Sequence, residues 1–230
     1  SSSAASDVYK RQDFVAPRGA GSLEHVTALN PATRVEGLAD AAFTLHVPED
    51  VYTRIRATYA PLVEGKTVVG LSPNSIVERK TKSRGIDHNR VWAEFIAYLQ
   101  QQGYFILLIP HSMRTGSKSG HNNDLVLIND IMQHLDSTEG LHVVSEPYDC
   151  KELRVVVGLA DYYVASRFHA MISALCERVP VSVFGWGFQK YVEVLQEFDL
   201  PEYCHDAAEL TVDALVAGFE RVVADAESIK

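Results

Sequence analysis

The chain has 230 residues, of which 47% are hydrophobic and 22% are charged, and its formal net charge at pH 7 is −9. That length has room for one sizeable core, or for one domain and part of another. The sequence holds no basic stripe that could neutralise the phosphates of a nucleic acid, and no apolar run near the ~20 residues of a membrane span. We therefore expect neither a nucleic-acid partner nor a transmembrane segment.

The first 47 residues are expected to lie outside the main domain. Residues 1–12 carry no fold signal and resemble a cloning scar, so we expect them to be disordered and the natural N-terminus to be missing. Residues 13–36 are rich in proline and glycine and are predicted to be irregular, and residues 38–45 to form a closing strand or loop. Residues 13–47 would then be a remnant of an N-terminal domain with its connection, and residues 48–230 a Rossmann-like domain.

Helices and strands alternate from residue 48 onward. Pro48-Glu49-Asp50 is typical of a helix start, and Val51, Ile55, Tyr59 and Leu62 would share one face of that helix. Strands are predicted over residues 67–71, 104–109, 141–145, 161–165 and 181–184, and further helices over residues 88–99, 124–135, 150–160, 168–178, 189–197 and 211–226. This alternation predicts an α/β fold with a doubly wound, Rossmann-like parallel sheet.

Cysteine usage gives no sign of a disulfide framework or a metal site. Cys150, Cys176 and Cys204 are odd in number and lack metal-ligand spacing. We expect free thiols, buried or partly buried, in a reducing cytoplasm. No metal is predicted.

The most informative stretch is Ser166-Arg167-Phe168-His169, which lies between an apolar run and a segment with helical spacing. Open α/β sheets bind ligands at the carboxyl ends of their strands, and helix N-termini favour anions. Arg167 could hold a carboxylate or phosphate bidentately, or it could pair with a structural acid. His169 could be a general acid or a phosphate donor, or a hydrogen-bonded structural histidine. The stretch predicts a site for a negatively charged small molecule.

Polar residues also follow the other predicted strands, and these strand ends should meet at one edge of the sheet. The further candidates for substrate binding are Asn74, Ser75, His111, Glu146, Gly185 and Lys190. Asn74 and Ser75 could donate to an anion or simply form a turn. His111 could contact a ligand or cap the sheet edge. Lys190 could complete a cationic pocket or be a surface lysine, and Glu146 could contact an acceptor hydroxyl.

Two other polar segments have ordinary structural interpretations. Residues 79–84 contain four basic side chains and are predicted to form a solvated loop, which could also close over an anionic ligand. Residues 121–124 are expected to cap the helix that follows them.

Several of these motifs occur together in one known family. The motifs are Val69-Gly70-Leu71-Ser72-Pro73, Leu108-Ile109-Pro110-His111, Asn123-Asp124, Glu152-Leu153, Ala165-Ser166-Arg167-Phe168-His169-Ala170 and Val179-Pro180-Val181 leading to Gly185. In this order they resemble the C-terminal half of the polysaccharide pyruvyl transferase family, over residues 34–200. Ala41 stands where the family's D-P-A-F element has proline. Residues 72–75 lack the arginine that many members carry after the first strand.

The resemblance implies half of a two-domain, GT-B-like enzyme that transfers pyruvate from phosphoenolpyruvate to a sugar. The product would be a pyruvate ketal and the by-product phosphate, with no cofactor besides the donor. Arg167 and His169 would carry the chemistry, with Ser166 and Phe168 beside them and Lys190 matching a family lysine less closely. The acceptor would be a sugar or lipid-linked glycan of a surface polysaccharide. We then expect a cytoplasmic location, peripheral at the inner membrane surface, and self-association through the exposed domain face.

Two other functions remain open at this point. A GT-B glycosyltransferase would use the same sheet edge for a nucleotide-sugar donor, and Glu146 or Glu193 could then bind the ribose. A non-catalytic module would bind phosphate-bearing ligands without turnover.

Overall fold

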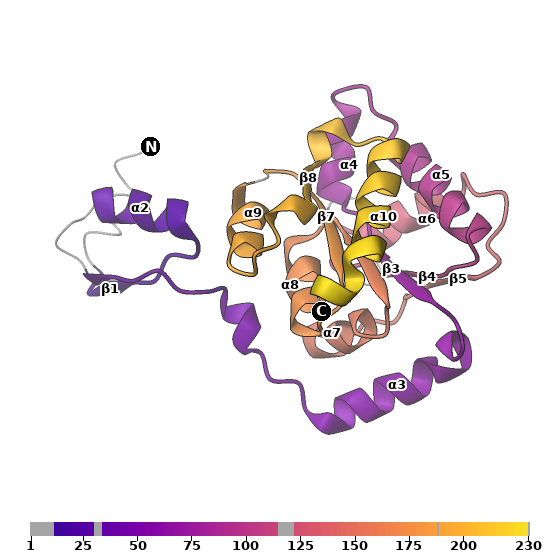
Figure 1. The fold of residues 1–230 in the computed structure, drawn as a ribbon, viewed down its shortest axis with the longest axis horizontal. Coiled ribbons are helices and arrows are strands. Elements are labelled where there is room, and N and C mark those ends of the chain that lie inside the picture. Colours follow the sequence, from indigo (N-terminus) through magenta and orange to yellow (C-terminus); the bar gives the residue numbers. More distant parts are fainter. Residues whose placement is uncertain (1–11, 30–33, 115–121, 188, 230) are drawn as a thin grey trace.

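The computed structural model describes residues 12–29, 34–114, 122–187 and 189–229. Its centre is a six-stranded sheet with the order β5-β4-β3-β6-β7-β8 (Figure 1). Each neighbouring pair of these strands is parallel. The strands are β3 (Val68–Ser72), β4 (Phe105–Leu108), β5 (Leu141–Val143), β6 (Tyr162–Ala165), β7 (Val181–Gly185) and β8 (Cys204–Asp206). This order is that of a doubly wound sheet, which confirms the predicted fold class.

Helices cover both faces of the sheet, and each face has its own apolar cluster. One face packs against α3 (Glu49–Val63), α7 (Cys150–Val157), α8 (Phe168–Cys176) and α9 (Gln189–Gln196). The other packs against α5 (His88–Gln101), α6 (Asp124–Met132) and α10 (Val212–Ile229). β3 and β4 are buried along their whole length, and Ser72 is the one polar residue in them, as expected for strands that are covered on both faces.

Local signals set where the helices begin. The Asp87 side chain accepts from the N–H of Arg90 at the start of α5. Asp149 and Glu152 form the predicted capping box at the start of α7. At the centre of the sheet, Gly70 allows close packing, since a Cβ there would lie 2.4 Å from the ring of Tyr163.

The predicted basic loop is in fact helical. Residues 75–82 form α4 (Ser75–Lys82), and the Asn74 side chain caps it by accepting from the N–H of Ile76. Val77 and Thr81 are buried on its inner face. The run of basic residues hid this amphipathic pattern, because the three that fall within the short helix, Arg79, Lys80 and Lys82, are exposed.

The sixth strand was missing from the prediction. β8 is only three residues long and carries Cys204, His205 and Asp206, which do not form an apolar run. Its pairing with β7 comes from tertiary structure, so periodicity alone did not indicate it.

The prediction that residues 13–36 are irregular is wrong. They contain β1 (Phe14–Val15), α2 (Ala20–Leu29) and β2 (Arg34–Val35), with β1 and β2 paired in parallel. The predicted strand or loop over residues 38–45 contains the 3₁₀ helix η1 (Ala41–Thr44), capped by Asp40. Figure 1 shows this N-terminal segment beside the sheet domain, joined to it through α3. Residues 1–11 and His121 lie outside the described residues.

Cysteine exposure differs from the expectation at one position. All three thiols are free, but Cys150 is exposed at the start of α7, whereas Cys176 is partly buried and Cys204 is buried. Within the described part of the chain, every helix is too short or too polar to cross a membrane.

Candidate functional site

The strand order reverses between β3 and β6, and a cavity of about 400 Å³ lies beside the residues that follow these two strands. Ligands of open α/β sheets bind where the order reverses. Arg18, Arg167 and Lys190 contribute cationic side chains to its wall, and Asn74 and His169 also line it. We call this the cationic cavity.

Arg167 is held by a buried carboxylate. Its Nε donates to Oδ2 of Asp124 at 2.9 Å, and its Nη2 donates to Oδ1 at 2.6 Å. Asp124 is fully buried, while 14% of the Arg167 side chain is exposed. Arg167 therefore pairs with a structural acid, which was one of its two predicted roles. Its side chain also lines the cationic cavity, as the other role, anion binding, requires. The pair fixes the plane of the guanidinium at the edge of the cavity.

Asp124 also joins the loops that follow β3 and β4. Its Oδ1 accepts from the N–H of Ser75, and its Oδ2 accepts from the N–H of Ser112, both at 3.0 Å. Ser75 in turn accepts from Nη2 of Arg167 at 3.2 Å. One carboxylate thus connects the starts of α4, α6 and α8, so Ser75 supports Arg167.

Two further cations come from distant parts of the chain. The Arg18 guanidinium lies over the Phe168 ring, 4.1 Å from its centroid, and pairs with Asp40. Lys190 lies 5.6 Å from the same centroid. Burial lowers the pKa of Lys190, and the positive charges of Arg18 and Arg167 lower it further. The cavity therefore brings three cationic side chains together, of which Arg18 and Arg167 are paired with carboxylates outside its wall and Lys190 forms no ion pair with a described residue.

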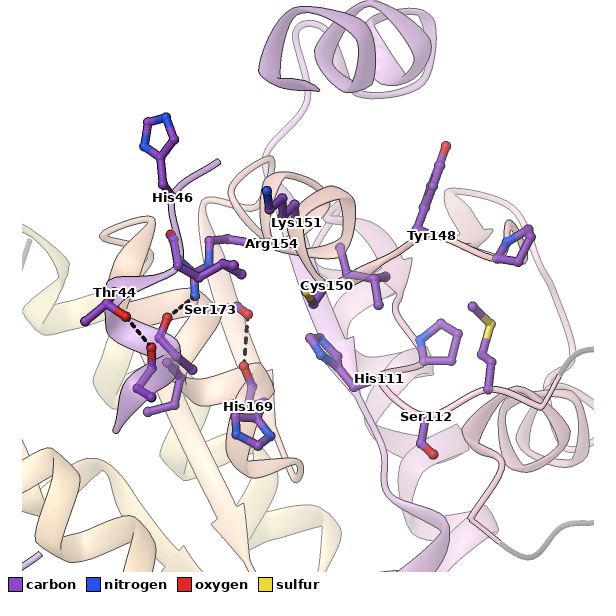
Figure 2. Close-up of a pocket in the computed structure, with 18 residues that line it drawn as sticks. Thr44, His46, His111, Ser112, Tyr148, Cys150, Lys151, Arg154, His169 and Ser173 are labelled. Atoms are coloured by element: carbon purple, nitrogen blue, oxygen red, sulfur yellow. Dashed lines mark hydrogen bonds between the residues drawn. The ribbon is translucent and has the colours of Figure 1, made fainter. Parts of the chain in front are cut away.

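A second and larger cavity adjoins the first. It has a volume of about 980 Å³ and lies between η1, the loop after β4, the start of α7, and α8 (Figure 2). We call it the wide cavity. His111, Ser112 and His169 line both cavities. The two histidines therefore lie where the cavities meet.

His111 is connected to the centre of the sheet. Its Nε2 lies 3.1 Å from the hydroxyl of Tyr163, which is also hydrogen-bonded to Ser72. Burial lowers the pKa of His111 to about 4; the carboxylate of Asp124 opposes this shift, whereas Arg167 and His169 add to it. His111 is thus an uncharged imidazole near neutral pH.

The predicted site residues are brought together only in part. Asn74, His111, Arg167, Phe168, His169 and Lys190 line the cationic cavity. Ser166 is buried, and its carbonyl accepts from Asn74 and from Tyr191. Gly185 packs against Tyr191, since a Cβ there would lie 2.5 Å from that ring.

Two acidic residues lie elsewhere. Glu146 is exposed and accepts from the N–H of Ser145 and from the hydroxyl of Tyr59. Glu193 accepts from the N–H of Gly21 and from Gln189. Within the described residues, neither cavity is lined by an aspartate or glutamate.

Sequence reasoning missed three residues that shape the site. Asp124 was expected as part of a helix cap and as one of the family motifs, but without a role in the site. Arg18 lay in a segment predicted to be irregular, and Tyr163 was one apolar position in a strand. The spacing of Asp124 from Arg167 carries no local signal, because the pair joins loops 43 residues apart. Only the strand order, which places those loops at one edge, could have suggested it.

Known structures support the fold. The N-terminal domain of trehalose-6-phosphate phosphatase from Candida albicans matches with a TM-score of 0.54 and 8% identity. The match covers 94% of this chain and 53% of that chain, so the chain spans about half the length of that structure. At this identity the likeness concerns the fold alone.

The family follows from the sequence match. The profile of the polysaccharide pyruvyl transferases matches residues 2–187, which is most of the chain. The match includes the residues after β3, β4 and β6 that form the cationic cavity. The chain belongs to the polysaccharide pyruvyl transferase family.

Proposed function

We propose that this protein binds phosphoenolpyruvate in the cationic cavity and transfers its pyruvate to a sugar of a surface polysaccharide or glycan precursor. One observation supports this most directly: Arg18, Arg167 and Lys190 line one cavity that no described acidic side chain enters. Phosphoenolpyruvate carries about three negative charges near neutral pH, so its site must supply several cations.

The charges of the cavity fit a trianion better than a neutral ligand. Lys190 has its pKa lowered because burial and two guanidinium groups disfavour its ammonium form. A bound phosphate or carboxylate would relieve this repulsion, which favours binding. The N-terminus of α8 adds the partial positive charge of its free N–H groups.

We assign the proton transfer to His169. It is the second residue of α8, it is exposed, and it lines both cavities. In the proposed reaction His169 gives a proton to the methylene carbon, so that the C=C electron pair becomes a C–H bond. A sugar hydroxyl then bonds to the cationic carbon, phosphate leaves with its C–O electron pair, and a second hydroxyl closes the ketal. The two hydroxyl protons replace the one given by His169 and protonate the phosphate.

A nucleotide-sugar donor fits this site less well. The sequence suggested Glu146 or Glu193 as the acidic side chain that would bind the ribose of such a donor. In the structure these two carboxylates bond to other parts of the chain. The described part of the cationic cavity is lined by cations, histidines and aromatic rings instead. A module that binds anions without turnover would share the same cations, so turnover separates that alternative.

The test is a calorimetric titration of the chain with phosphoenolpyruvate. We expect one site per chain, with an affinity that falls as salt is added, because the contacts are between charges. Turnover is then assayed with methyl hexopyranosides, following phosphate release and the new methyl signal of a ketal by proton NMR. Binding of UDP-glucose in preference to phosphoenolpyruvate would contradict the proposal.

A further inference from the structure

A chain of hydrogen bonds runs behind the two cavities. It begins at the carbonyl of Ile109, which accepts from the hydroxyl of Ser72 at 2.7 Å. The Ser72 hydroxyl is also hydrogen-bonded to the hydroxyl of Tyr163. The Tyr163 hydroxyl lies 3.1 Å from Nε2 of His111. Ser72 and Tyr163 are fully buried, so water does not compete for these bonds.

Only one arrangement of hydrogens satisfies this chain. A carbonyl can only accept, so the single proton of Ser72 points to Ile109. Tyr163 must then donate to Ser72, which leaves its oxygen as an acceptor for His111. His111 must therefore carry its proton on Nε2. Its Nδ1 is left with a lone pair, and no described residue donates to it.

His111 keeps this form near neutral pH. Burial lowers its pKa to about 4, and the nearby charges of Arg167 and His169 lower it as well. Burial also raises the pKa of Tyr163, so the phenol stays protonated. Figure 2 shows the His111 ring projecting into the wide cavity, in the direction of Cys150.

We propose that the wide cavity binds the acceptor sugar and that Nδ1 of His111 takes the proton of the attacking hydroxyl. This inference rests on the proposed function, which assigns the donor to the cationic cavity. The two ligands would then meet where His111 and His169 line both cavities, with one histidine giving a proton to the donor and the other receiving one from the acceptor.

The proton transfer balances at each atom. The O–H bond of the sugar breaks, its oxygen bonds to the carbon that becomes the ketal centre, and the proton passes to Nδ1. A weak base suffices, because a hydroxyl bonded to a cationic carbon is strongly acidic. The imidazolium that forms keeps its bond to Tyr163 and faces the charge of Asp124. It returns to neutral by giving the proton to the departing phosphate.

Nitrogen NMR of the chain labelled with ¹⁵N-histidine tests the first step. A His111→Gln variant identifies the His111 signals, and His134→Gln is a matched control because His134 is exposed at the end of α6. We expect the Nε2–H form, and a neutral ring from pH 7 down to about pH 5. Tyr163→Phe removes the hydroxyl that accepts from Nε2, so His111 in this variant should no longer favour the Nε2–H tautomer. An Nδ1–H form, or titration near the ordinary pKa of histidine, would overturn the proposal.

The second step uses sugar probes in the presence of phosphoenolpyruvate. Methyl hexopyranosides of the gluco, galacto and manno series should shift the Nδ1 signal of His111. His111→Gln should lower turnover by about 10²–10⁴-fold, a much larger factor than any loss of phosphoenolpyruvate affinity, and Tyr163→Phe should lower turnover less than His111→Gln does. A protein that binds phosphoenolpyruvate but whose Nδ1 signal responds to none of these glycosides would overturn the acceptor assignment. A parent chain that shows the expected His111 tautomer but does not bind phosphoenolpyruvate would instead contradict the proposed function.

Discussion

The two cavities adjoin each other but are built differently. Three cations line the cationic cavity, and one of them, Arg167, is fixed by a buried aspartate. The wide cavity has the hydroxyl groups of Thr44, Tyr148 and Ser173 in its wall. It also contains Lys151 and Arg154, and the Arg154 guanidinium donates to the backbone carbonyls of Ala42 and Leu45. Fixed charge suits a small trianion of constant shape, whereas hydroxyl and aromatic groups suit a larger uncharged sugar. The difference supports the proposed assignment of the donor to the cationic cavity and of the acceptor to the wide cavity.

The largest expected effect comes from removing the buried carboxylate that holds Arg167 at the cationic cavity. Asp124→Ala removes the acceptor of Arg167 and of the N–H groups of Ser75 and Ser112. We expect a loss of about 3–5 kcal/mol in the free energy of unfolding, because a buried ion pair is broken on one side. Urea unfolding measures it, with Asp130→Ala on the exposed face of the same helix as the control. A loss below about 1 kcal/mol would contradict the role given to Asp124.

A buried histidine away from both cavities shows what burial alone does. Nε2 of His88 accepts from the indole of Trp92 at 3.1 Å, the opposite tautomer to that inferred for His111. Burial lowers the pKa of His88 to about 4, below the 6.5 of an unfolded histidine. The unfolded chain therefore binds more protons, and stability falls as the pH drops from 6.5 towards 4. The loss from this group is about 3 kcal/mol.

Chemical unfolding at several pH values measures this loss. His88→Gln keeps an acceptor for Trp92 but does not titrate, so its stability should depend less steeply on pH in this range. An unchanged slope in the variant would show that His88 does not carry the effect.

The geometry of Arg167 should matter as well as its charge. Arg167→Lys keeps one positive charge but loses the planar group that bonds to both oxygens of Asp124. We expect phosphoenolpyruvate affinity to fall about 10–100-fold, which corresponds to about 1.4–2.7 kcal/mol. Calorimetry measures this, with Arg178→Lys as the control, because Arg178 is exposed and lies just beyond the far end of α8. Equal affinity in the two variants would mean that charge alone is recognised.

The smallest expected effect compares a lysine in one cavity with a lysine in the other. Lys190→Met should weaken phosphoenolpyruvate binding about tenfold, or about 1.4 kcal/mol. Lys151→Met, in the wide cavity, should leave that affinity unchanged. Since the pKa of Lys190 is lowered, the affinity of the parent should fall at alkaline pH as Lys190 loses its proton, and the variant should lack this fall. Equal effects of the two lysines would remove the distinction between the cavities.

Local patterns predicted most of the sheet and the start of α8. Apolar runs of strand length mark β3, β4, β6 and β7, and the polar stretch after β6 shows where Arg167 and His169 begin a helix. These features depend on neighbours in the sequence. The family resemblance rested on the same stretch, and the sequence profile confirms it.

The remaining parts of the site depend on contacts between distant segments. The ion pair of Arg167 with Asp124 and the position of Arg18 over Phe168 follow from the packing of loops, which no periodicity encodes. Glu146 follows β5, which is at the edge of the sheet, and its carboxylate bonds to Tyr59 rather than facing the reversal of strand order. A polar residue at the end of a strand is therefore expected to belong to the site only when that strand is close to the reversal of strand order.

The most direct test of the central claim is ligand-observed NMR of this chain with phosphoenolpyruvate, in competition with UDP-glucose and inorganic phosphate. We expect phosphoenolpyruvate to bind in preference to both, and Arg167→Ala to abolish its binding while the chain stays folded. Preference for UDP-glucose, or phosphoenolpyruvate binding as tight in Arg167→Ala as in the parent, would contradict the assignment of the cationic cavity to the donor.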